Sequence, residues 1–414
     1  MPLRRPSALL FSLLTVASFL VGATSVQAQL LGPVQTLPGL QAPGVGLPRV
    51  VSTRPLRSMD DLVRGSLALT RKLQIDALRR SEPRRVDVDP QGAPILRGEF
   101  LAMGLSGAQL DAVRALGFSV DRATPADATL GLDFVVLRDT RGRSTARAMR
   151  ALQQAAPDAA ITYQHLYLPA GGDLARATTS AAPSSSAPSQ RVGLIDGGVD
   201  PSAPALARAR IERHGCSTAN PSRHGTAVAA RLVAGDPDTL YAADLWCGDA
   251  VGGATSNLVD ALAWMAREGV AVVNISLVGP DNPVLARAVQ AMIARGHVLV
   301  SAVGNDGPAA PPLFPAAYPD VIGVSGVDAR DRVLPESGSG DQVDFCASGV
   351  DGSGRNALRG TSFAAPIVAR KAARLLGAPS EGAAAQVQQQ LVGAARHLGA
   401  PGHDPRYGYG LLSP

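Results

Sequence analysis

Three side chains that could together form a nucleophilic catalytic site lie far apart in the chain. Asp196 follows Ile195 and precedes two glycines, His224 begins the string His-Gly-Thr, and Ser362 lies within Gly-Thr-Ser-Phe-Ala-Ala-Pro. A serine hydroxyl is a poor nucleophile near neutral pH unless an imidazole accepts its proton and a carboxylate orients that imidazole. These residue types therefore predict acyl transfer through a covalent serine intermediate.

The order Asp, His, Ser and the serine-containing segment make the chain resemble the subtilisin-like serine peptidases. Asp-Gly-Gly is common in turns and His-Gly-Thr at helix starts, so the serine segment carries most of the specificity. The resemblance covers residues 191–412. It implies that Ser362 attacks a peptide carbonyl, that His224 acts as general base and then general acid, and that Asp196 orients the imidazole.

A fourth segment extends this resemblance. Residues 298–303 are apolar, as in a buried strand, and are followed by Gly304 and Asn305. The segment is similar to the family's oxyanion-hole segment. We therefore expect the Asn305 side chain and the Ser362 N–H to hold the negative charge that develops on the carbonyl oxygen.

The resemblance also implies which residues bind an extended substrate. They are the strand residues Ser276, Leu277, Val278 and Gly279, together with Leu313 near the base of the first specificity pocket.

Among the departures from the pattern that this resemblance implies, three bear on the first pocket and on Asp196. Val278 and Leu313 stand where the family often has glycine, and both fill space. We therefore expect a shallow first pocket that accepts small or medium apolar side chains. Gly197 replaces the usual threonine or serine after the aspartate, and we expect the missing hydroxyl to loosen the hydrogen bonding around Asp196.

The three cysteines Cys216, Cys247 and Cys346 all lie within the region of resemblance. An exported protein can form disulfides, and an odd count leaves at least one thiol. In the family the strands before the first two positions are parallel neighbours. The resemblance thus implies a disulfide between Cys216 and Cys247.

No metal or other cofactor is expected. The cysteine spacing fits no zinc motif, and no acidic loop has the ligand spacing of a calcium site. The acidic residues Asp341, Asp344 and Asp351 are expected at a solvated edge.

The composition indicates a globular protein with a sizeable core. The chain has 414 residues, of which 46% are hydrophobic and 18% charged, and this length permits two or three domains. The net charge is only +5, and no basic run alternates with aromatic residues, so no nucleic-acid partner is expected. The expected partners are protein or peptide substrates, and we expect a monomer.

The N-terminal region has the features of a targeting signal. Residues 1–28 contain two arginines, a short apolar stretch and small residues suited to signal peptidase, and no cysteine follows for a lipid anchor. We expect an exported protein, periplasmic or secreted, without a membrane anchor. Residues 29–93 are predicted to form a poorly ordered segment and then an amphipathic helix at 58–83. A membrane-surface helix is the alternative for the latter.

Residues 94–170 alternate short strands and helices in the order strand, helix, strand, strand, helix, strand, with the last strand at 161–167. This is the ferredoxin-like order, and the layout resembles the propeptides of secreted subtilisin-like enzymes. We expect this domain to assist folding of the slow parallel sheet and to inhibit the enzyme. Residues 171–190 are predicted to form a flexible linker where the chain is cut.

Residues 191–414 alternate buried strands with helices, which predicts an α/β peptidase domain of the subtilisin-like three-layer type with a mostly parallel sheet. Within it, a helix is predicted to begin at Ser362. The expected function is that of a self-processed secreted serine endopeptidase. Two alternatives stay open: a catalytically silent relative that acts as a binding protein, and a serine esterase or transpeptidase.

Overall fold

The computed structural model describes residues 71–122, 129–170, 189–236, 238–352 and 357–414. The predicted signal peptide and most of the predicted linker lie outside these residues. No helix in the described ranges combines the length and apolar character needed to cross a membrane.

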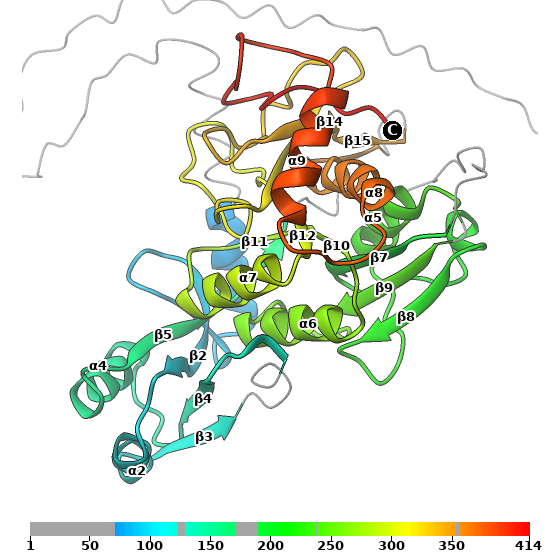
Figure 1. The fold of residues 1–414 in the computed structure, drawn as a ribbon. Coiled ribbons are helices and arrows are strands. Elements are labelled where there is room, and N and C mark those ends of the chain that lie inside the picture. The colour runs from blue at the N-terminus through cyan, green and yellow to red at the C-terminus, as the bar shows by residue number, and fades with distance from the viewer. Residues whose placement is uncertain (1–70, 123–128, 171–188, 237, 353–356) are drawn as a thin grey trace, which may run out of the picture. The chain divides into compact units, whose positions relative to one another are not determined.

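A parallel sheet of seven strands forms the centre of the C-terminal domain, in the order β14-β13-β12-β10-β7-β9-β8 (Figure 1). Most of its strands are apolar, β-branched runs buried on both faces, as a covered parallel sheet requires. The strands are β7 Arg191–Asp196, β8 Arg210–His214, β9 Thr239–Asp244, β10 Val272–Ile275, β12 Val298–Ala302, β13 Ile322–Val327 and β14 Phe345–Ser348.

Helices cover both faces of this sheet and complete the three layers. Alternate strand residues point to opposite faces, so Leu194 packs in one apolar cluster and Ile195 in the other. The first cluster includes residues of α5 Arg223–Val233, α8 Ala365–Leu375 and α9 Ala383–Ala394. The second includes residues of α6 Thr255–Arg267 and α7 Pro283–Ala294. The predicted α/β fold class is confirmed.

The residues before this domain form a smaller α+β module. Its antiparallel strands lie in the order β5-β2-β4-β3, with β1 also paired to β2, which is a ferredoxin-like arrangement. Its elements are β1 Val86–Val88, β2 Pro94–Met103, α2 Gly107–Ala115, β3 Phe118–Arg122, β4 Phe134–Asp139, α4 Thr145–Ala155 and β5 Ala160–His165.

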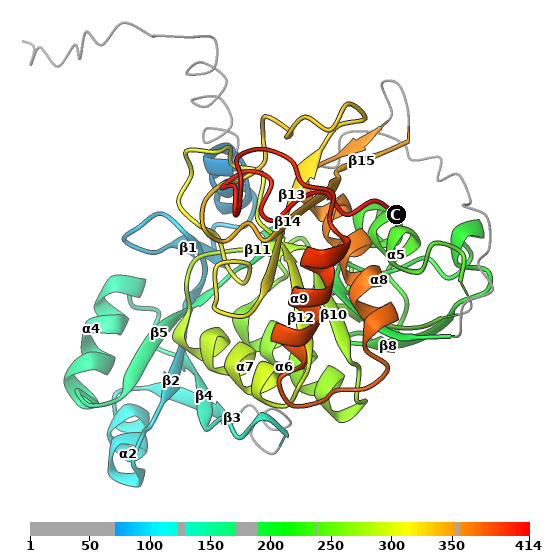
Figure 2. The same cartoon turned by 45° about the horizontal axis from the view of Figure 1, so that its top comes forward.

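The two faces of the module sheet have different partners. Phe100 and Leu137 pack under the module's own helices, whereas Leu101 and Phe134 join the cluster formed by α6 and α7. Figures 1 and 2 show α2 and α4 on the side of the module away from the large domain. The module therefore buries its second face on the large domain.

The end of the module differs from the sequence-based prediction of one strand at 161–167. β5 ends at His165, and a separate strand β6, Leu168–Pro169, pairs antiparallel with β11, Leu277–Val278, of the large domain. His165 marks the change of direction because its buried ring bonds Asp89 on one side and Asn282 on the other. The last residues of the module are thus strand partners of the large domain.

The helix before the module is described for residues 71–81. Ile75 is buried, and Leu78 packs on a small apolar cluster that contains Val86 and Leu166. The Arg71 guanidinium donates to the Val278 carbonyl at 3.1 Å. This part of the helix therefore packs on protein, unlike the membrane-surface alternative.

Asp344 does not lie at a solvated edge, so that prediction is wrong for this residue. It accepts hydrogen bonds from the Gly323 N–H and the Gln388 side chain, both at 2.7 Å, and so ties α9 to β13. Burial raises the pKa of the Asp344 carboxyl to about 6, although the Gly323 N–H opposes the shift.

Replacing Asp344 with Asn should flatten the pH dependence of stability. A carboxyl with a raised pKa binds its proton more tightly in the folded state, so its contribution is present below about pH 4 and is lost as pH rises through about 6. Up to about 3 kcal/mol of the free energy of unfolding should be lost over this range. Urea unfolding of the variant and its parent at several pH values measures it. Equal pH slopes in Asp344→Asn and its parent would contradict the assignment, and Asp341→Asn is the exposed control.

Candidate active site

The predicted carboxylate and imidazole form a buried pair at the C-terminal ends of the parallel strands. Asp196 is the last residue of β7, and its Oδ1 lies 2.9 Å from His224 Nδ1 in the first turn of α5. Both side chains are at least 94% buried. A proton on Nδ1 that bonds the carboxylate leaves Nε2 in the acceptor form, which is the tautomer that a general base needs.

Glycine at two positions permits this pairing. A Cβ on Gly225 would lie 2.3 Å from the Gly197 carbonyl oxygen, and one on Gly198 would lie 2.0 Å from the Asn220 carbonyl oxygen. Such contacts are not found in proteins, so larger residues would force α5 away from β7. The glycines that flank the reactive residues thus set the distance between Asp196 and His224.

Ser362 lies close to this pair, in a 3-10 turn and not at the start of an α-helix as predicted. The turn η3 spans Thr361–Phe363, and α8 begins only at Ala365. Pro366 fits the first turn of α8, where a missing N–H has no cost, and this fixes the helix start after the serine. The Phe363 ring packs on the His224 ring with centroids 5.4 Å apart, so the turn is held against the imidazole.

Asn305 connects the loop after β12 to this turn. Its Oδ1 accepts from the Thr361 N–H at 2.9 Å, which fixes the amide orientation, and its Nδ2 donates to the carbonyl oxygen of Ala170. The Gly304 N–H also donates to Thr361 Oγ1 at 3.2 Å. The amide that was predicted to bind an oxyanion therefore points at a peptide carbonyl from the end of the module.

The strand residues predicted to bind substrate line the same place. The Ser276 carbonyl accepts from the Ala170 N–H at 3.0 Å and from Ser362 Oγ at 3.4 Å. Leu277 and Val278 pair with Pro169 and Leu168 in β6. An extended segment of the chain therefore lies along β11 with its end at the serine.

Three residues lie together where the first pocket was predicted. A Cβ on Gly304 would lie 2.7 Å from Leu313 Cδ1 and 3.8 Å from Val278 Cγ1. Both apolar side chains therefore occupy the space beside Gly304. Gly279 is the residue after Val278, and a Cβ on it would lie 2.6 Å from the Tyr167 ring. The structure thus gathers all of the predicted triad, oxyanion and substrate-binding residues at one site.

Comparison with known proteins agrees with this geometry. Residues 189–410 match the sequence model of the subtilase family. The chain belongs to the subtilase family. It is therefore a serine-type endopeptidase, a hydrolase, of subtilisin-like fold.

Individual subtilases show how far the likeness extends. A subtilisin of Bacillus pumilus is 31% identical over 248 residues, which are 54% of this chain and 88% of the relative. Subtilisin E of Bacillus subtilis is also 31% identical over 248 residues, but these cover 64% of that relative. In three dimensions the chain is similar to fervidolysin of Fervidobacterium pennivorans, with a TM-score of 0.62 and 18% identity, over 79% of this chain and 61% of that one.

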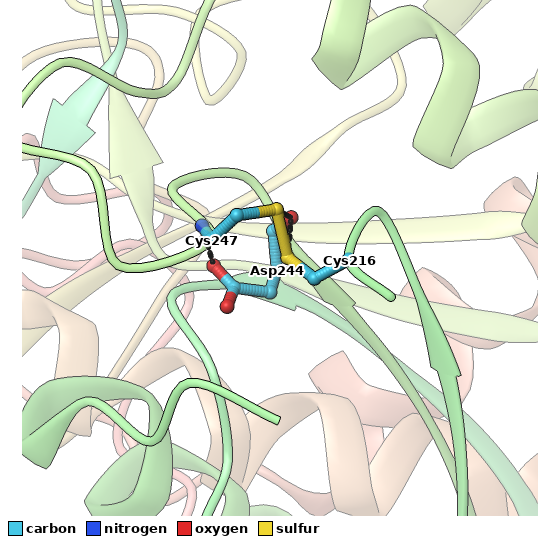
Figure 3. A group of neighbouring side chains, drawn as sticks. All are labelled: Cys216, Asp244 and Cys247. Atoms are coloured by element: carbon cyan, nitrogen blue, oxygen red, sulfur yellow. Dashed lines mark hydrogen bonds between the residues drawn. A yellow bond between two sulfur atoms is a disulfide. The ribbon is translucent and has the colours of Figure 1, made fainter. Parts of the chain in front are cut away.

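The subtilase disulfide expected from the sequence is present in the structure. Cys216 follows β8 and Cys247 follows its parallel neighbour β9, and the two sulfurs are bonded (Figure 3). Asp244, the last residue of β9, accepts from the Cys247 N–H at 3.1 Å and from the Trp246 N–H at 2.9 Å. Since both sulfurs are in the disulfide, this trio cannot act as a thiolate metal site, although its ligand atoms lie close together.

Cys346 is the third cysteine and carries a thiol. It is fully buried in β14, and burial raises the pKa of this thiol to about 12. A thiol that stays protonated is a poor nucleophile, so Cys346 is a core residue.

Sequence reasoning missed two residues beside the site. Trp246 lines a cavity of about 240 Å³ together with His224 and Pro169, and its place directly after a buried strand was the available signal. Arg71 reaches the Val278 carbonyl and pairs with Asp306 at 3.4 Å. Nothing in the local sequence distinguishes Arg71 from other helix arginines.

Gly197 has a specific neighbour in this subtilase. Its N–H donates to Asp196 Oδ1 at 2.6 Å, and a Cβ at this position would lie 2.6 Å from Ser222 Oγ. Ser222 is the N-cap of α5 and accepts from the Gly225 N–H at 2.9 Å. The serine side chain thus fills the space that a residue at 197 would need.

Replacing Gly197 with Thr should therefore destabilise the protein and lower activity, although threonine is common here in the family. The new side chain displaces Ser222, and loss of such a cap costs about 1 kcal/mol before any shift of His224. The double variant Gly197→Thr with Ser222→Gly should recover much of both losses, whereas Ser222→Gly alone should cost only a few tenths of a kcal/mol. Unfolding and kcat measurements on the three variants test this. A single Gly197→Thr variant as stable and active as its parent would refute the assignment.

Proposed function

We propose that this chain is the precursor of an exported endopeptidase that cleaves proteins through an acyl-enzyme on Ser362 and processes itself. One observation carries the proposal. The residues up to Ala170 lie along β11. The Ala170 N–H donates to the Ser276 carbonyl, which also accepts from Ser362 Oγ. The Ala170 carbonyl accepts from the Asn305 amide. These contacts bring a peptide carbonyl to the Asn305 amide and the Ser362 turn, which supports the proposed attack.

The first chemical step uses three buried residues. Ser362 Oγ forms a bond to the carbonyl carbon while its proton moves to His224 Nε2, and Asp196 stabilises the resulting imidazolium. The carbonyl oxygen gains negative charge, which Asn305 Nδ2 and the Ser362 N–H stabilise. The C–N bond then breaks, and His224 gives its proton to the leaving amine.

The second step returns the enzyme to its starting state. Water attacks the serine ester, His224 accepts a proton from this water, and the same oxyanion donors act again. The C–O bond to Ser362 breaks, and the serine oxygen recovers its proton. The products are a carboxylate and an amine, and no cofactor is consumed.

The N-terminal module is proposed to act as chaperone and inhibitor of the domain that follows it. Its sheet contributes Leu101 and Phe134 to the cluster around α6 and α7, so it covers apolar surface of the large domain. A small antiparallel domain has shorter-range contacts than a seven-stranded parallel sheet and can fold first. Its final strand β6 then occupies the cleft.

We also propose how the chain is divided into segments and that it is exported. We assign residues 1–28 to a signal peptide, 94–170 to the propeptide, 171–190 to a linker and 191–414 to the peptidase domain. The disulfide between Cys216 and Cys247 supports export, because such bonds persist in oxidising compartments.

Replacing Ser362 with Ala should abolish labelling by a fluorophosphonate probe and stop loss of the N-terminal region. The alanine lacks the nucleophile, while its small side chain fits the buried turn. Mass spectrometry of labelled peptides and N-terminal sequencing measure both effects, with Ser348→Ala as a control on a serine outside the site. A folded wild-type protein that takes no label after removal of the module would favour the silent binding protein. Ester turnover without amide turnover would favour the esterase.

Replacing Asn305 with Ala should lower kcat by roughly 100- to 1000-fold with a small change in KM. This magnitude is the one measured for an oxyanion donor in subtilisin, and the donor acts mainly in the transition state. Steady-state kinetics with a peptide anilide, on variant enzyme processed in trans, measure it. A loss confined to KM would contradict the oxyanion role.

Replacing Leu313 with Gly should admit larger residues at the first pocket. The wild type should cleave after Ala or Leu faster than after Phe, because Leu313 and Val278 fill the space beside Gly304. The variant should raise kcat/KM for the Phe substrate by roughly 10-fold or more. Rates on matched Ala, Leu and Phe peptides test this, and a strong Phe preference in the wild type would refute it.

A further inference from the structure

The helix that precedes the module reaches the large domain through the side chain of Arg71. The Arg71 guanidinium donates to the Val278 carbonyl at 3.1 Å, and its Nε lies 3.4 Å from Asp306 Oδ2. The side chains of Arg71 and Asp306 are each only 15% exposed. A helix outside both the module sheet and β6 thus makes a largely buried, charged contact with the large domain.

The two partners of Arg71 belong to different segments beside the proposed active site. Val278 lies in β11, the strand that pairs with β6. Asp306 directly follows Asn305, in residues 303–307, which we call the oxyanion loop. Gly304 of this loop lies close to Val278, because a Cβ on the glycine would be 3.8 Å from Val278 Cγ1. Arg71 therefore bridges β11 and the oxyanion loop from outside the strand that occupies the cleft.

The helix is docked on the protein by the face that carries Arg71. Ile75 and Leu78 follow Arg71 at the i+4 and i+7 positions, so the three side chains share one face. Ile75 is buried, and Leu78 packs on the apolar cluster that contains Leu166. Leu73, on another face, is 52% exposed. The helix is thus held beside the residues that lead from β5 into β6.

Arg71 and Asp306 compensate each other's charge in a place with little solvent. Burial lowers the pKa of the Arg71 guanidinium and raises the pKa of the Asp306 carboxyl, and in each case the opposite charge of the partner opposes the shift. Removal of one member of a buried pair leaves the other charge desolvated and uncompensated. The contact therefore contributes more to docking than an exposed pair such as Arg85 with Asp249.

We propose that this helix is a second inhibitory element of the precursor, separate from β6, and that Arg71 is its latch. The proposal rests on the proposed function. Arg71 ties β11 to the oxyanion loop while β6 pairs with β11. Because the helix, the module and β6 belong to one chain, each contact raises the effective concentration of the others. The latch thus strengthens binding of the module after the linker is cut.

Removing the guanidinium tests the latch. Arg71→Met keeps an apolar stem and should raise the dissociation constant of the module from the processed enzyme by roughly 10- to 100-fold, the range for hydrogen bonds to charged groups. The self-processed complex obtained from the full chain is diluted in steps, and initial hydrolysis of a peptide anilide is measured at each concentration. Intact mass verifies that the module is not digested during the measurement. The concentration at which half of the activity appears gives the dissociation constant.

Arg79→Met is the matched control. Arg79 lies in the same helix, its side chain is 45% exposed, and it pairs with Asp76 of that helix. Both substituted positions precede the linker, so the wild-type and variant precursors yield an identical mature enzyme. A difference in dissociation constant therefore reports the helix contact and no change in the catalytic domain. Equal constants for Arg71→Met, Arg79→Met and wild type would overturn the latch.

A double-mutant cycle tests the pairing of Arg71 with Asp306. Asp306→Asn removes the charge and keeps the shape, and its activity after complete removal of the module is the reference for its own dilution series. The effect of Arg71→Met on the dissociation constant should be roughly 3-fold or more smaller in the Asp306→Asn background, because contacting residues are not additive. Fully additive effects would overturn the bridge to the oxyanion loop.

Arg71→Lys provides a variant that keeps the charge. Lysine lacks the planar fork of donors that bonds two partners together, so its dissociation constant should lie between those of wild type and Arg71→Met. If the Arg71→Met precursor does not fold, Arg71→Lys alone decides, and a constant equal to that of wild type overturns the latch.

These outcomes separate the latch from the function beneath it. A wild-type protein that is labelled at Ser362 by a fluorophosphonate, with Arg71→Met releasing the module at the wild-type concentration, keeps the peptidase function and loses the latch. A folded wild-type protein that takes no label after removal of the module loses both.

Discussion

The backbone of Ser276 connects the parts of the site that must meet. Its N–H donates to the Ile195 carbonyl beside Asp196, and its carbonyl accepts from both Ala170 and Ser362. Its side chain accepts from Asn274 and donates to the Ser362 carbonyl. The residue directly after β10 thus holds the strand β6 beside Ser362, the proposed nucleophile, and the other site residues lie around that point.

Close packing of backbone, more than ion pairing, sets the catalytic distances. The first turn of α5 approaches β7 because Gly225 carries no side chain, and the segment along β11 fits because Gly279 and Gly253 carry none. The buried pair of Asp196 and His224 then needs no exposed salt bridge to position it. Exposed pairs such as Arg85 with Asp249 add little by comparison, since solvent screens them.

Much of the fold and the pairing of Asp196 with His224 could be predicted from the sequence. The buried apolar strands of the parallel sheet and the glycine-flanked Asp196, His224 and Ser362 carry local signals. Other features depend on contacts between distant segments. The exact start of α8, the separation of β6 from β5 and the bonds of Arg71 to Val278 are set by packing that no local pattern encodes. The prediction for Asp344 was wrong for the same reason, because its partners come from β13 and α9.

The module's position in the cleft has a consequence for when activity appears. While the chain is continuous, β6 lies on β11 at a high effective concentration, so the proposed inhibitory module would compete with any substrate. Once the tether is cut, the same contacts become a bimolecular complex whose occupancy depends on the amount of free module. In the proposed precursor, dilution after export or digestion of the released module would then lower that occupancy. Under the proposed function, the covalent link delays proteolysis until the chain has been cut and the module diluted outside the producing cell.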